Sequence, residues 1–369
     1  MMLLILFVVF ILEAVMILAH VLIYKSIILL LGISTPSILI VLKSIFAVGS
    51  ISFLGSTLIA SRWHNRLTRI FYLLASVWLT IVYIFLITSV IGVLCLYFFN
   101  LDPSQKLVLG ISLYSLAAAI VIYSFIKPIL IKIKEIELNF SSLPEYWRGK
   151  KIVFISDLHL GPIHHISFAK RISAIIQDIH PETLLIGGDL FDGTEVNAGD
   201  VLVPLSDIQT TYGTYFITGN HEEFDGSANK FIKAIDSAGF KILHNKAVDL
   251  NGLIIAGVDY YETRKAEDFK NILASLNLDL SKPNILLKHV PSNLNIVADA
   301  GFDAVLSGHT HNGQVYPFGF FAKLSYGYRY GLHLLKKTQI YVSSGLGTWG
   351  PPARIASTSE IVLITLKEK

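Results

Sequence analysis

The stretch Thr183–Asp192, TLLIGGDLFD, joins a short apolar run to two glycines and two aspartates. A run of this length that stops at glycine is typical of a buried strand followed by a turn. KIVFISDLH (151–159) and TYFITGNHE (214–222) repeat the arrangement, and GLIIAGVDY, NILLKHV and DAVLSGH continue it. Helical stretches are expected between the first strands, at 165–180, 197–209 and 227–239. This alternation predicts an α/β domain, from residue 150 to residue 369, whose strands are covered on both faces.

The first third of the chain has a different composition. Residues 1–126 hold six basic and two acidic side chains, whereas the remaining residues hold 24 basic and 25 acidic ones. A helix needs about 20 apolar residues to cross a hydrocarbon layer of about 30 Å. Four segments are long enough, at 2–24, 37–60, 70–98 and 107–126. Residues 1–128 are therefore expected to form an all-α transmembrane bundle, and 129–149 a linker with the first strand.

The turn between the first two segments is expected within residues 26–36, because Pro36 favours a helix start and restricts the residue before it. Loop charge predicts the orientation, since short loops rich in Lys and Arg stay cytoplasmic. The basic residues concentrate in the second loop and after the last span, at Arg62, Arg66, Arg69, Lys127, Lys132 and Lys134. We therefore expect a multi-pass protein of the cell membrane whose C-terminal domain is cytoplasmic.

Two ionisable residues, Glu13 and Lys43, fall within the expected spans. Such groups are often functional, and these two would pair across the first two helices. The alternative is that Lys43 extends its amine toward an interface while Glu13 is neutral or faces a neighbouring helix.

Charge and cysteine content exclude two classes of function. The near-neutral C-terminal part contains no run of Lys or Arg, so no nucleic-acid partner is expected, because phosphate-backbone binding needs a concentrated basic surface. Cys95 is the only cysteine and lies in an apolar run, so neither a disulfide framework nor a cysteine metal site exists within one chain.

Residues capable of metal binding collect where the expected strands end. In a sheet of this kind, ligands bind beyond the carboxyl ends of the strands. Five strand ends supply three Asp, one Asn and five His, namely Asp157, His159, Asp189, Asp192, Asn220, His221, His289, His309 and His311. Each alone is an ordinary capping or hydrogen-bonded residue, but their repetition at five strand ends favours two divalent ions with a shared carboxylate.

The ordered set resembles the calcineurin-like metallophosphoesterase superfamily. The matching motifs are Asp157-x-His159, Gly188-Asp189-x-x-Asp192, Gly219-Asn220-His221-Glu222, His289 and Gly308-His309-x-His311. SGHTHNGQ (307–314) and SGLGTWGPPAR (344–354) are similar to the membrane-associated bacterial YkuE/YaeI-like branch. The resemblance implies a two-sheet sandwich flanked by helices, with the ligands in loops at one edge.

The resemblance also implies a ligand set for two cations. Asp157, His159, Asp189 and His311 would hold the first ion. Asn220, His289, His309 and the same Asp189 would hold the second. These donors suit Mn, Fe, Zn, Ni or Mg alike.

By the same resemblance, a hydroxide shared by the two ions would attack phosphorus, so no side-chain nucleophile is needed. His221 would protonate the leaving oxygen as general acid. Asp192 would orient the His221 ring, or would be a turn residue before Gly193.

The expected function is a metal-dependent phosphoesterase that cleaves phosphodiester, phosphomonoester or pyrophosphate bonds, with membrane lipids as its surroundings. One alternative is a lipid-linked substrate, as for a UDP-2,3-diacylglucosamine pyrophosphatase, because some superfamily members act in lipid A synthesis. An alternative of another class is a non-catalytic membrane scaffold or sensor, but loss of a ligand would mark it and none is lost. The small number of charges within the expected spans argues against a transporter or channel.

Three further features have two interpretations each. His164 and His165 would touch a substrate phosphate, or would be ordinary solvent-facing residues at the start of a helix. Arg354 would meet a non-scissile phosphate or hold the last loop. The aromatic and glycine-rich segment 315–331 would form an apolar ledge beside the metals, able to face lipid, or a buried hairpin.

Overall fold

The computed structural model describes residues 2–60, 62–63, 65–193, 198–223 and 228–369. The chain divides into two compact units. One consists of Met1–Ile126 with Gly350–Ala353, and the other consists of Lys127–Trp349 with Arg354–Lys369.

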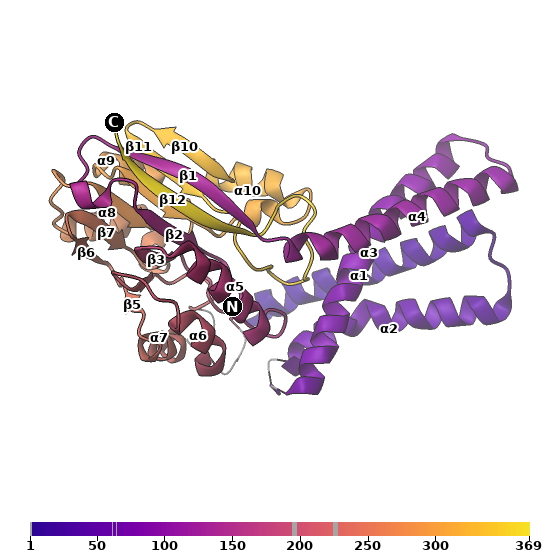
Figure 1. Ribbon diagram of the computed structural model, residues 1–369. Coiled ribbons are helices and arrows are strands. Elements are labelled where there is room, and N and C mark those ends of the chain that lie inside the picture. The colour runs from indigo at the N-terminus through magenta and orange to yellow at the C-terminus, as the bar shows by residue number, and fades with distance from the viewer. Residues whose placement is uncertain (1, 61, 64, 194–197, 224–227) are drawn as a thin grey trace. The chain divides into compact units, whose positions relative to one another are not determined.

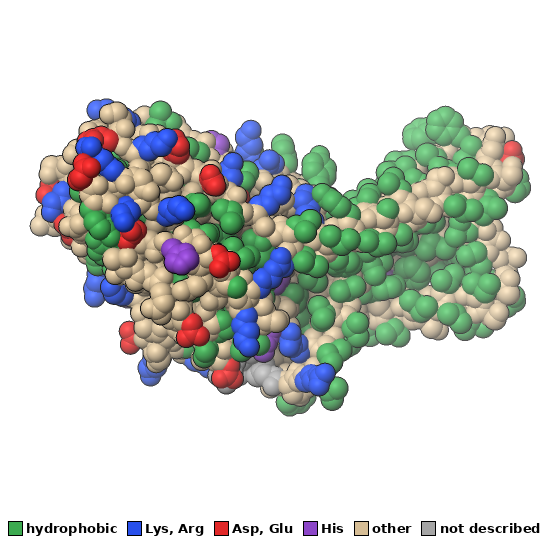
Figure 2. All heavy atoms as spheres, viewed as in Figure 1, with side chains coloured by type: hydrophobic (Ala, Val, Ile, Leu, Met, Phe, Trp, Pro, Cys, Tyr) green, Lys and Arg blue, Asp and Glu red, His purple; other side chains and the backbone are tan. Residues whose placement is uncertain are grey.

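The first unit contains four long helices, each apolar enough to cross a membrane (Figure 1). Their bounds are α1 (Met2–Leu31), α2 (Pro36–Ala60), α3 (Arg66–Phe98) and α4 (Pro103–Ile126). Hydrophobic side chains cover much of the visible surface of these helices, whereas charged side chains concentrate on the other unit (Figure 2). The four predicted spans are therefore present as helices.

The predicted turn over residues 26–36 is wrong in its extent. Helix α1 continues through Leu31, because the apolar run SIILLL extends the preceding helix. The helix ends at Gly32, whose φ of +64° lies in the left-handed region that glycine adopts at little cost. Residues 32–35 alone connect α1 to α2.

Polar side chains inside the first unit form specific contacts between helices. The Trp78 indole donates a hydrogen bond of 2.9 Å to Nε2 of the buried His20. Gly49 leaves room for that indole, since a Cβ at this position would lie 2.2 Å from Trp78 Nε1. Among the described residues, no ion pair joins Glu13 to Lys43, so the interpretation that they pair across the first two helices is wrong.

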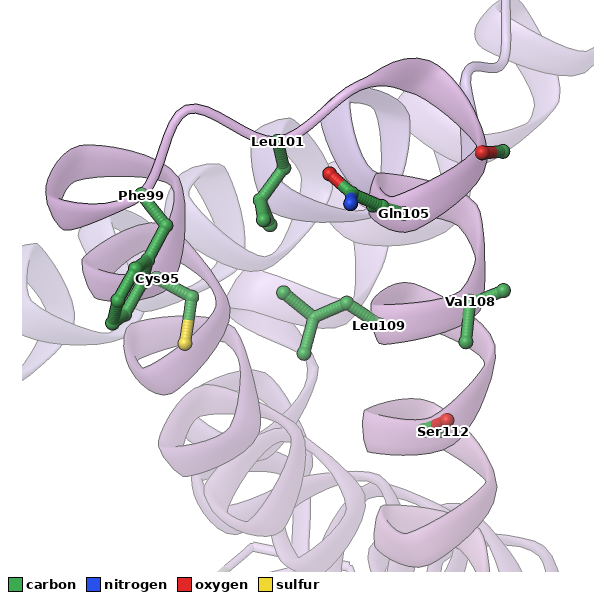
Figure 3. A pocket seen from close by; sticks show the side chains of 8 residues that line it. Cys95, Phe99, Leu101, Gln105, Val108, Leu109 and Ser112 are labelled. Atoms are coloured by element: carbon green, nitrogen blue, oxygen red, sulfur yellow. The ribbon is translucent and has the colours of Figure 1, made fainter.

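A hollow of about 480 Å³ lies between the end of α3 and the start of α4. Figure 3 shows Cys95 and Phe99 on the α3 side and Val108 and Leu109 on the α4 side. Cys95 is a free, half-buried thiol here.

The second unit is built on two six-stranded sheets. The first has the order β1-β12-β2-β3-β4-β5, with bounds Lys132–Phe140, Glu360–Glu368, Lys151–Ile155, Thr183–Ile186, Thr214–Phe216 and Lys241–Ile242. The second has the order β10-β11-β9-β8-β7-β6, with bounds Gly331–Leu335, Thr338–Val342, Ala304–Ser307, Asn284–Leu287, Leu253–Gly257 and Lys246–Leu250.

Helices cover the outer faces of both sheets. The first sheet packs against α5 (Ile166–Ile179), α6 (Ala198–Ser206) and α7 (Ala228–Ser237). The second packs against α8 (Ala266–Ser275) and α9 (Leu294–Asp299). Two of the predicted helices begin at residues 197 and 227, which lie outside the described residues. Short 3₁₀ turns are η1 (Lys127–Ile129), η2 (Glu145–Trp147), η4 (Glu262–Arg264) and η5 (His311–Gly313).

Alternation along the buried strands produces three apolar cores. Ile152 and Phe154 of β2 point to the core between the two sheets, while Val153 and Ile155 point to the core under α5, α6 and α7. A strand with both faces buried reads as a continuous apolar run, which is why residues 152–155 of β2, IVFI, include no polar residue. The predicted two-sheet sandwich flanked by helices is confirmed.

Strand β12 lies between β1 and β2. It pairs parallel with β1, where Lys132 is opposite Glu360, and antiparallel with β2. Strand β1 is the edge of this sheet, and β12 is its neighbour there.

The interpretation of segment 315–331 as a buried hairpin is wrong. Residues Phe318–Tyr326 form helix α10, and β10 begins only at Gly331. Gly319 packs this helix closely, because a Cβ there would lie 3.1 Å from the Asn312 carbonyl oxygen and 3.0 Å from Arg329 Nη1. The aromatic side chains of α10 are largely exposed.

Candidate metal centre

The loops that follow β2, β3, β4, β8 and β9 bring the predicted site residues together. Three loops leave the first sheet and two leave the second, so the residues gather at the edge where the carboxyl ends of both sheets meet. Three overlapping groups have ligand atoms within 4.8 Å of one another: Asp157, His159 and His311; His159, Asp189 and His221; Asp189, His289 and His309. The predicted residues from five strand ends thus form one cluster.

The first group joins the β2 loop to the β9 loop. His159 Nε2 lies 3.0 Å from His311 Nε2, and His311 Nε2 lies 3.6 Å from Asp157 Oδ1. All three side chains are buried. Two imidazole nitrogens and a carboxylate oxygen therefore converge on a small volume.

The third group contains Asp189, His289 and His309. His289 Nε2 lies 3.1 Å from Asp189 Oδ2 and 3.2 Å from Asn220 Oδ1. The other ring nitrogen of His289, Nδ1, donates a 2.8 Å hydrogen bond to the Gly187 carbonyl. That bond fixes the ring so that Nε2 faces the cluster, which is the usual arrangement behind a metal-binding histidine.

Asp189 lies between the first and third groups. Its Oδ2 is 4.0 Å from His159 Nε2 in addition to 3.1 Å from His289 Nε2. Burial raises the carboxyl pKa, but the neighbouring His289 outweighs it, so the pKa of Asp189 is lowered. The carboxylate is thus ionised and adjoins ligand atoms of both groups.

Two of the predicted histidine ligands, His309 and His311, are held in the neutral form that binds cations, whereas nearby carboxylates raise the pKa of His159 and bring that of His289 to about 9. Burial, and then the nearby His289, lower the pKa of His309 to about 3, and burial with His159 and Arg354 lowers that of His311 well below its usual value. Both rings are neutral at pH 7 and offer lone pairs. Burial raises the pKa of Asp157, which a cation would reverse. His159 Nδ1 is buried without a hydrogen-bond partner. Carboxylate, amide oxygen and imidazole are the donors that such ions bind.

The backbone of the predicted ligands is strained. Asp157, His159, Asp189, His309 and His311 all have positive φ, between 47° and 69°. Residues other than glycine seldom adopt this conformation, and each instance costs of order 1–3 kcal/mol where the surroundings enforce it. Such strain clusters at functional sites, and here it turns successive side chains toward one volume.

Two glycines permit the loops to approach one another. A Cβ at Gly308 would lie 2.3 Å from Asp157 Oδ2, and a Cβ at Gly219 would lie 2.1 Å from Asp189 Oδ1. Any side chain at these positions would displace a predicted ligand.

His221 and Asp192 meet through the main chain. His221 Nδ1 donates a 3.1 Å hydrogen bond to the Asp192 carbonyl oxygen, while the Asp192 carboxylate Oδ1 lies 3.5 Å from His159 Nδ1. The backbone of residue 192 therefore holds the His221 ring, and its side chain faces His159. His221 N also donates to Asp189 Oδ1 at 2.9 Å.

The sequence interpretation missed a role for Glu222. This fully buried carboxylate accepts hydrogen bonds from the amides of Gly219 at 2.7 Å and of Asp189 and Phe191 at 3.0 Å each. It thereby joins the loop after β3 to the loop after β4. Its position directly after His221 in the motif was the available signal.

We expect Glu222→Gln to destabilise the second unit by about 1–3 kcal/mol, because an amide offers one acceptor oxygen and turns its NH₂ toward backbone donors. Thermal unfolding of the purified chain, with bound metal measured in parallel, checks this. The matched control is Glu267→Gln, an exposed position on α8. An unfolding temperature for Glu222→Gln equal to that of the control would contradict the proposal that Glu222 joins the two loops.

Arg354 and His164 hold loops. The fully buried Arg354 guanidinium donates to the carbonyls of Ser344, Gly345 and Gly347, and its Nη2 lies 3.3 Å from His311 Nδ1. Of the two interpretations of Arg354, the structure supports the one in which it holds the last loop. His164 Nε2 accepts a 2.8 Å hydrogen bond from the Thr348 amide, which joins the β2 loop to that same last loop.

The part of the chain that holds this cluster resembles known proteins. The model of the calcineurin-like phosphoesterase family matches residues 150–313. A protein of Campylobacter jejuni named as an uncharacterized metallophosphoesterase is 36% identical over 267 residues, which cover 72% of this chain and 71% of that protein.

Two further relatives match a similar share of the chain. A transmembrane protein with metallophosphoesterase domain from Danio rerio is 32% identical, over 64% of this chain and 57% of its own length. The uncharacterized metallophosphoesterase YkuE of Bacillus subtilis is 28% identical, over 66% of this chain and 88% of its own length. The chain belongs to the calcineurin-like phosphoesterase family, whose members hydrolyse phosphoesters with metal ions.

Proposed function

We propose that this chain is a membrane-anchored phosphoesterase that uses two divalent cations to hydrolyse phosphodiester, phosphomonoester or pyrophosphate bonds. The observation that carries the proposal is the pair of ligand groups that adjoin through Asp189. A single-ion site would not need donors from five strand ends. A scaffold would not need His221 beside them.

Asp157, His159, Asp189 and His311 would hold one cation, and Asp189, Asn220, His289 and His309 the other. Two such ions would supply an acidified water and positive charge that offsets the charge developing on phosphate. The side chains of the cluster fix where the phosphate binds. The buried Asp189, between both groups, makes the two positions interdependent.

His221 is the proposed general acid. Its Nδ1 proton is committed to the Asp192 carbonyl, so the ring delivers a proton from Nε2. The ring stands 4.5 Å from the His159 ring, centre to centre, which places it at the border of the ligand cluster. From there it would protonate the leaving oxygen while the cluster holds the phosphate.

The membrane assignment rests on four helices that are long and apolar enough to span a bilayer. The basic residues Arg62, Arg66 and Arg69 adjoin the connection between α2 and α3, and Lys127, Lys132 and Lys134 follow α4. Because short basic loops stay on the cytoplasmic side, we assign the catalytic domain to that side.

A lipid-linked substrate is the second candidate. One observation favours it: helix α10, which carries four exposed apolar side chains, touches the cluster through Tyr326, whose hydroxyl lies 3.0 Å from His309 Nε2. A pyrophosphate such as that of UDP-2,3-diacylglucosamine would then reach the metals from a lipid phase.

The experiment is hydrolysis by the purified full chain in detergent. We expect cleavage of bis-p-nitrophenyl phosphate with Mn²⁺, loss of the activity on EDTA treatment and recovery when Mn²⁺ is returned. UDP-2,3-diacylglucosamine in the same assay separates the second candidate from the first. A rate that survives complete removal of metal would overturn the proposal.

A further inference from the structure

Helix α10 has two dissimilar faces. Gly319 and Tyr326 face the domain: Gly319 is buried, and Tyr326 is half-buried against His309. Elsewhere on the helix, Phe318, Phe320, Phe321 and Leu324 are 54%, 61%, 53% and 75% exposed. We call these four side chains the α10 apolar face. A helix with an exposed apolar face is typical of a surface that binds a membrane or another protein.

The neighbouring loops extend this surface. Tyr316 precedes α10 and is 72% exposed, and Trp349 is 61% exposed. Gln314 ties the two loops together, because its side chain both accepts from the Trp349 amide at 2.9 Å and donates to the Trp349 carbonyl at 3.0 Å. Aromatic side chains of this kind prefer the boundary between lipid headgroups and acyl chains.

The charge of the segment is one-sided. From Ala304 to Ser359 the sequence contains no Asp or Glu. Of its basic residues, Lys323 and Arg329 lie on and just after α10, whereas Arg354 is buried and Lys336 pairs with Asp299. Lys323 is exposed on α10 itself, and Arg329 is exposed shortly after it. A basic and aromatic surface complements anionic phospholipid headgroups, which attract Lys and Arg near the membrane.

The catalytic domain is connected to the candidate membrane spans by a short stretch of chain. Helix α4 is a candidate span that ends at Ile126, and β1 of the catalytic domain begins at Lys132. A domain tethered this closely meets the bilayer surface at high effective concentration, so even a small apolar face would be occupied. The match to the family model ends at residue 313, before α10 begins.

We propose that the α10 apolar face inserts into the phospholipid interface and thereby presents the metal cluster to phosphoesters carried by lipids. The inner side of the same helix contacts His309 through Tyr326, so insertion of α10 sets the depth of the cluster at the headgroup layer. The substrate class in this statement rests on the proposed function, whereas insertion of the helix does not.

The test uses the full chain in vesicles of phosphatidylcholine and phosphatidylglycerol. Cys95→Ser removes the only cysteine, and Leu324→Cys carries an environment-sensitive fluorophore. We expect blue-shifted emission, quenching by bromine-labelled acyl chains and protection from aqueous iodide. The matched control is Leu280→Cys, which is 55% exposed but precedes β8, at the edge of the sheet opposite the cluster. It should show the reverse pattern.

A label at position 324 that iodide quenches as strongly as one at 280 would overturn the proposal. So would a label shielded from both quenchers, because that result means contact with protein, either a second copy or another part of this chain.

A second arm measures activity. Phe320→Ser with Leu324→Ser should leave hydrolysis of bis-p-nitrophenyl phosphate unchanged and slow hydrolysis of a lipid phosphoester in vesicles roughly tenfold or more. Equal rates on the lipid substrate would count against the proposal. If the wild-type chain cleaves neither substrate while the label at 324 is quenched by lipid, the proposed function fails and the membrane contact of α10 stands.

Discussion

Replacing Asp189 with asparagine will lower the rate of phosphoester hydrolysis by about 10³-fold or more. Two cations at the proposed positions would supply several kcal/mol of transition-state stabilisation, and each 1.4 kcal/mol is tenfold in rate. Asp189 Oδ2 faces His289 at 3.1 Å and His159 at 4.0 Å, so an amide here weakens both ion positions at once. Initial rates with bis-p-nitrophenyl phosphate and elemental analysis of the same samples measure the two effects.

The matched control is Asp236→Asn, an exposed carboxylate on α7. It should keep both metal content and rate. If Asp189→Asn retained two ions per chain and the wild-type rate, the carboxylate would not be shared, and the two-cation proposal would fail.

Replacing His221 with alanine will separate proton donation from metal binding. We expect full metal content and a rate lowered by about 10²–10⁴-fold, the usual contribution of a positioned general acid. The loss should be largest for an alkyl phosphodiester, whose leaving alkoxide needs a proton, and small for a nitrophenyl ester, whose leaving group does not.

His180→Asn is a suitable control for His221→Ala. His180 is exposed at the end of α5 in the left-handed conformation that asparagine tolerates. An equal loss with both leaving groups would instead indicate that His221 positions the cluster, through its 2.9 Å backbone hydrogen bond to Asp189 or its ring contact with His159.

The strands and the ligand cluster were predictable because their causes are local. The strands at 151–155, 183–186 and 284–287 are buried on both faces, so each reads as a short apolar run. Polar residues follow each run within a few positions. The carboxyl ends of parallel strands share an edge, and that geometric rule brought Asp157 and Asp189 of the first sheet to one place.

Helix α10 was not predictable because its position depends on distant contacts. Residues 318–326, FGFFAKLSY, include aromatic residues and a glycine, which favour strands and turns as much as a helix. What fixes the helix is the close approach of Gly319 to Asn312 and Arg329, and the contact of Tyr326 with His309. Local propensity gives way where packing of this kind decides.

The roles of Glu222, Asp192 and Arg354 were hidden for a related reason. Glu222 accepts hydrogen bonds from amides of two loops. Arg354 donates hydrogen bonds to carbonyls that only the folded last loop brings within reach. Asp192 was expected to orient His221 with its carboxylate, but the contact comes from its carbonyl. Whether a side chain or its backbone makes a contact depends on loop conformation, which sequence spacing does not specify.

The placement of β12 bears on how the protein is made. Strand β1 is synthesised directly after α4, yet its partner in the sheet, β12, is the last strand to be translated. Until residues 360–368 emerge from the ribosome, β1 lacks its partner strand. The strand that directly follows α4 in the sequence is therefore the last to gain its partner, and a nascent chain stopped before β12 would leave an open strand that invites aggregation.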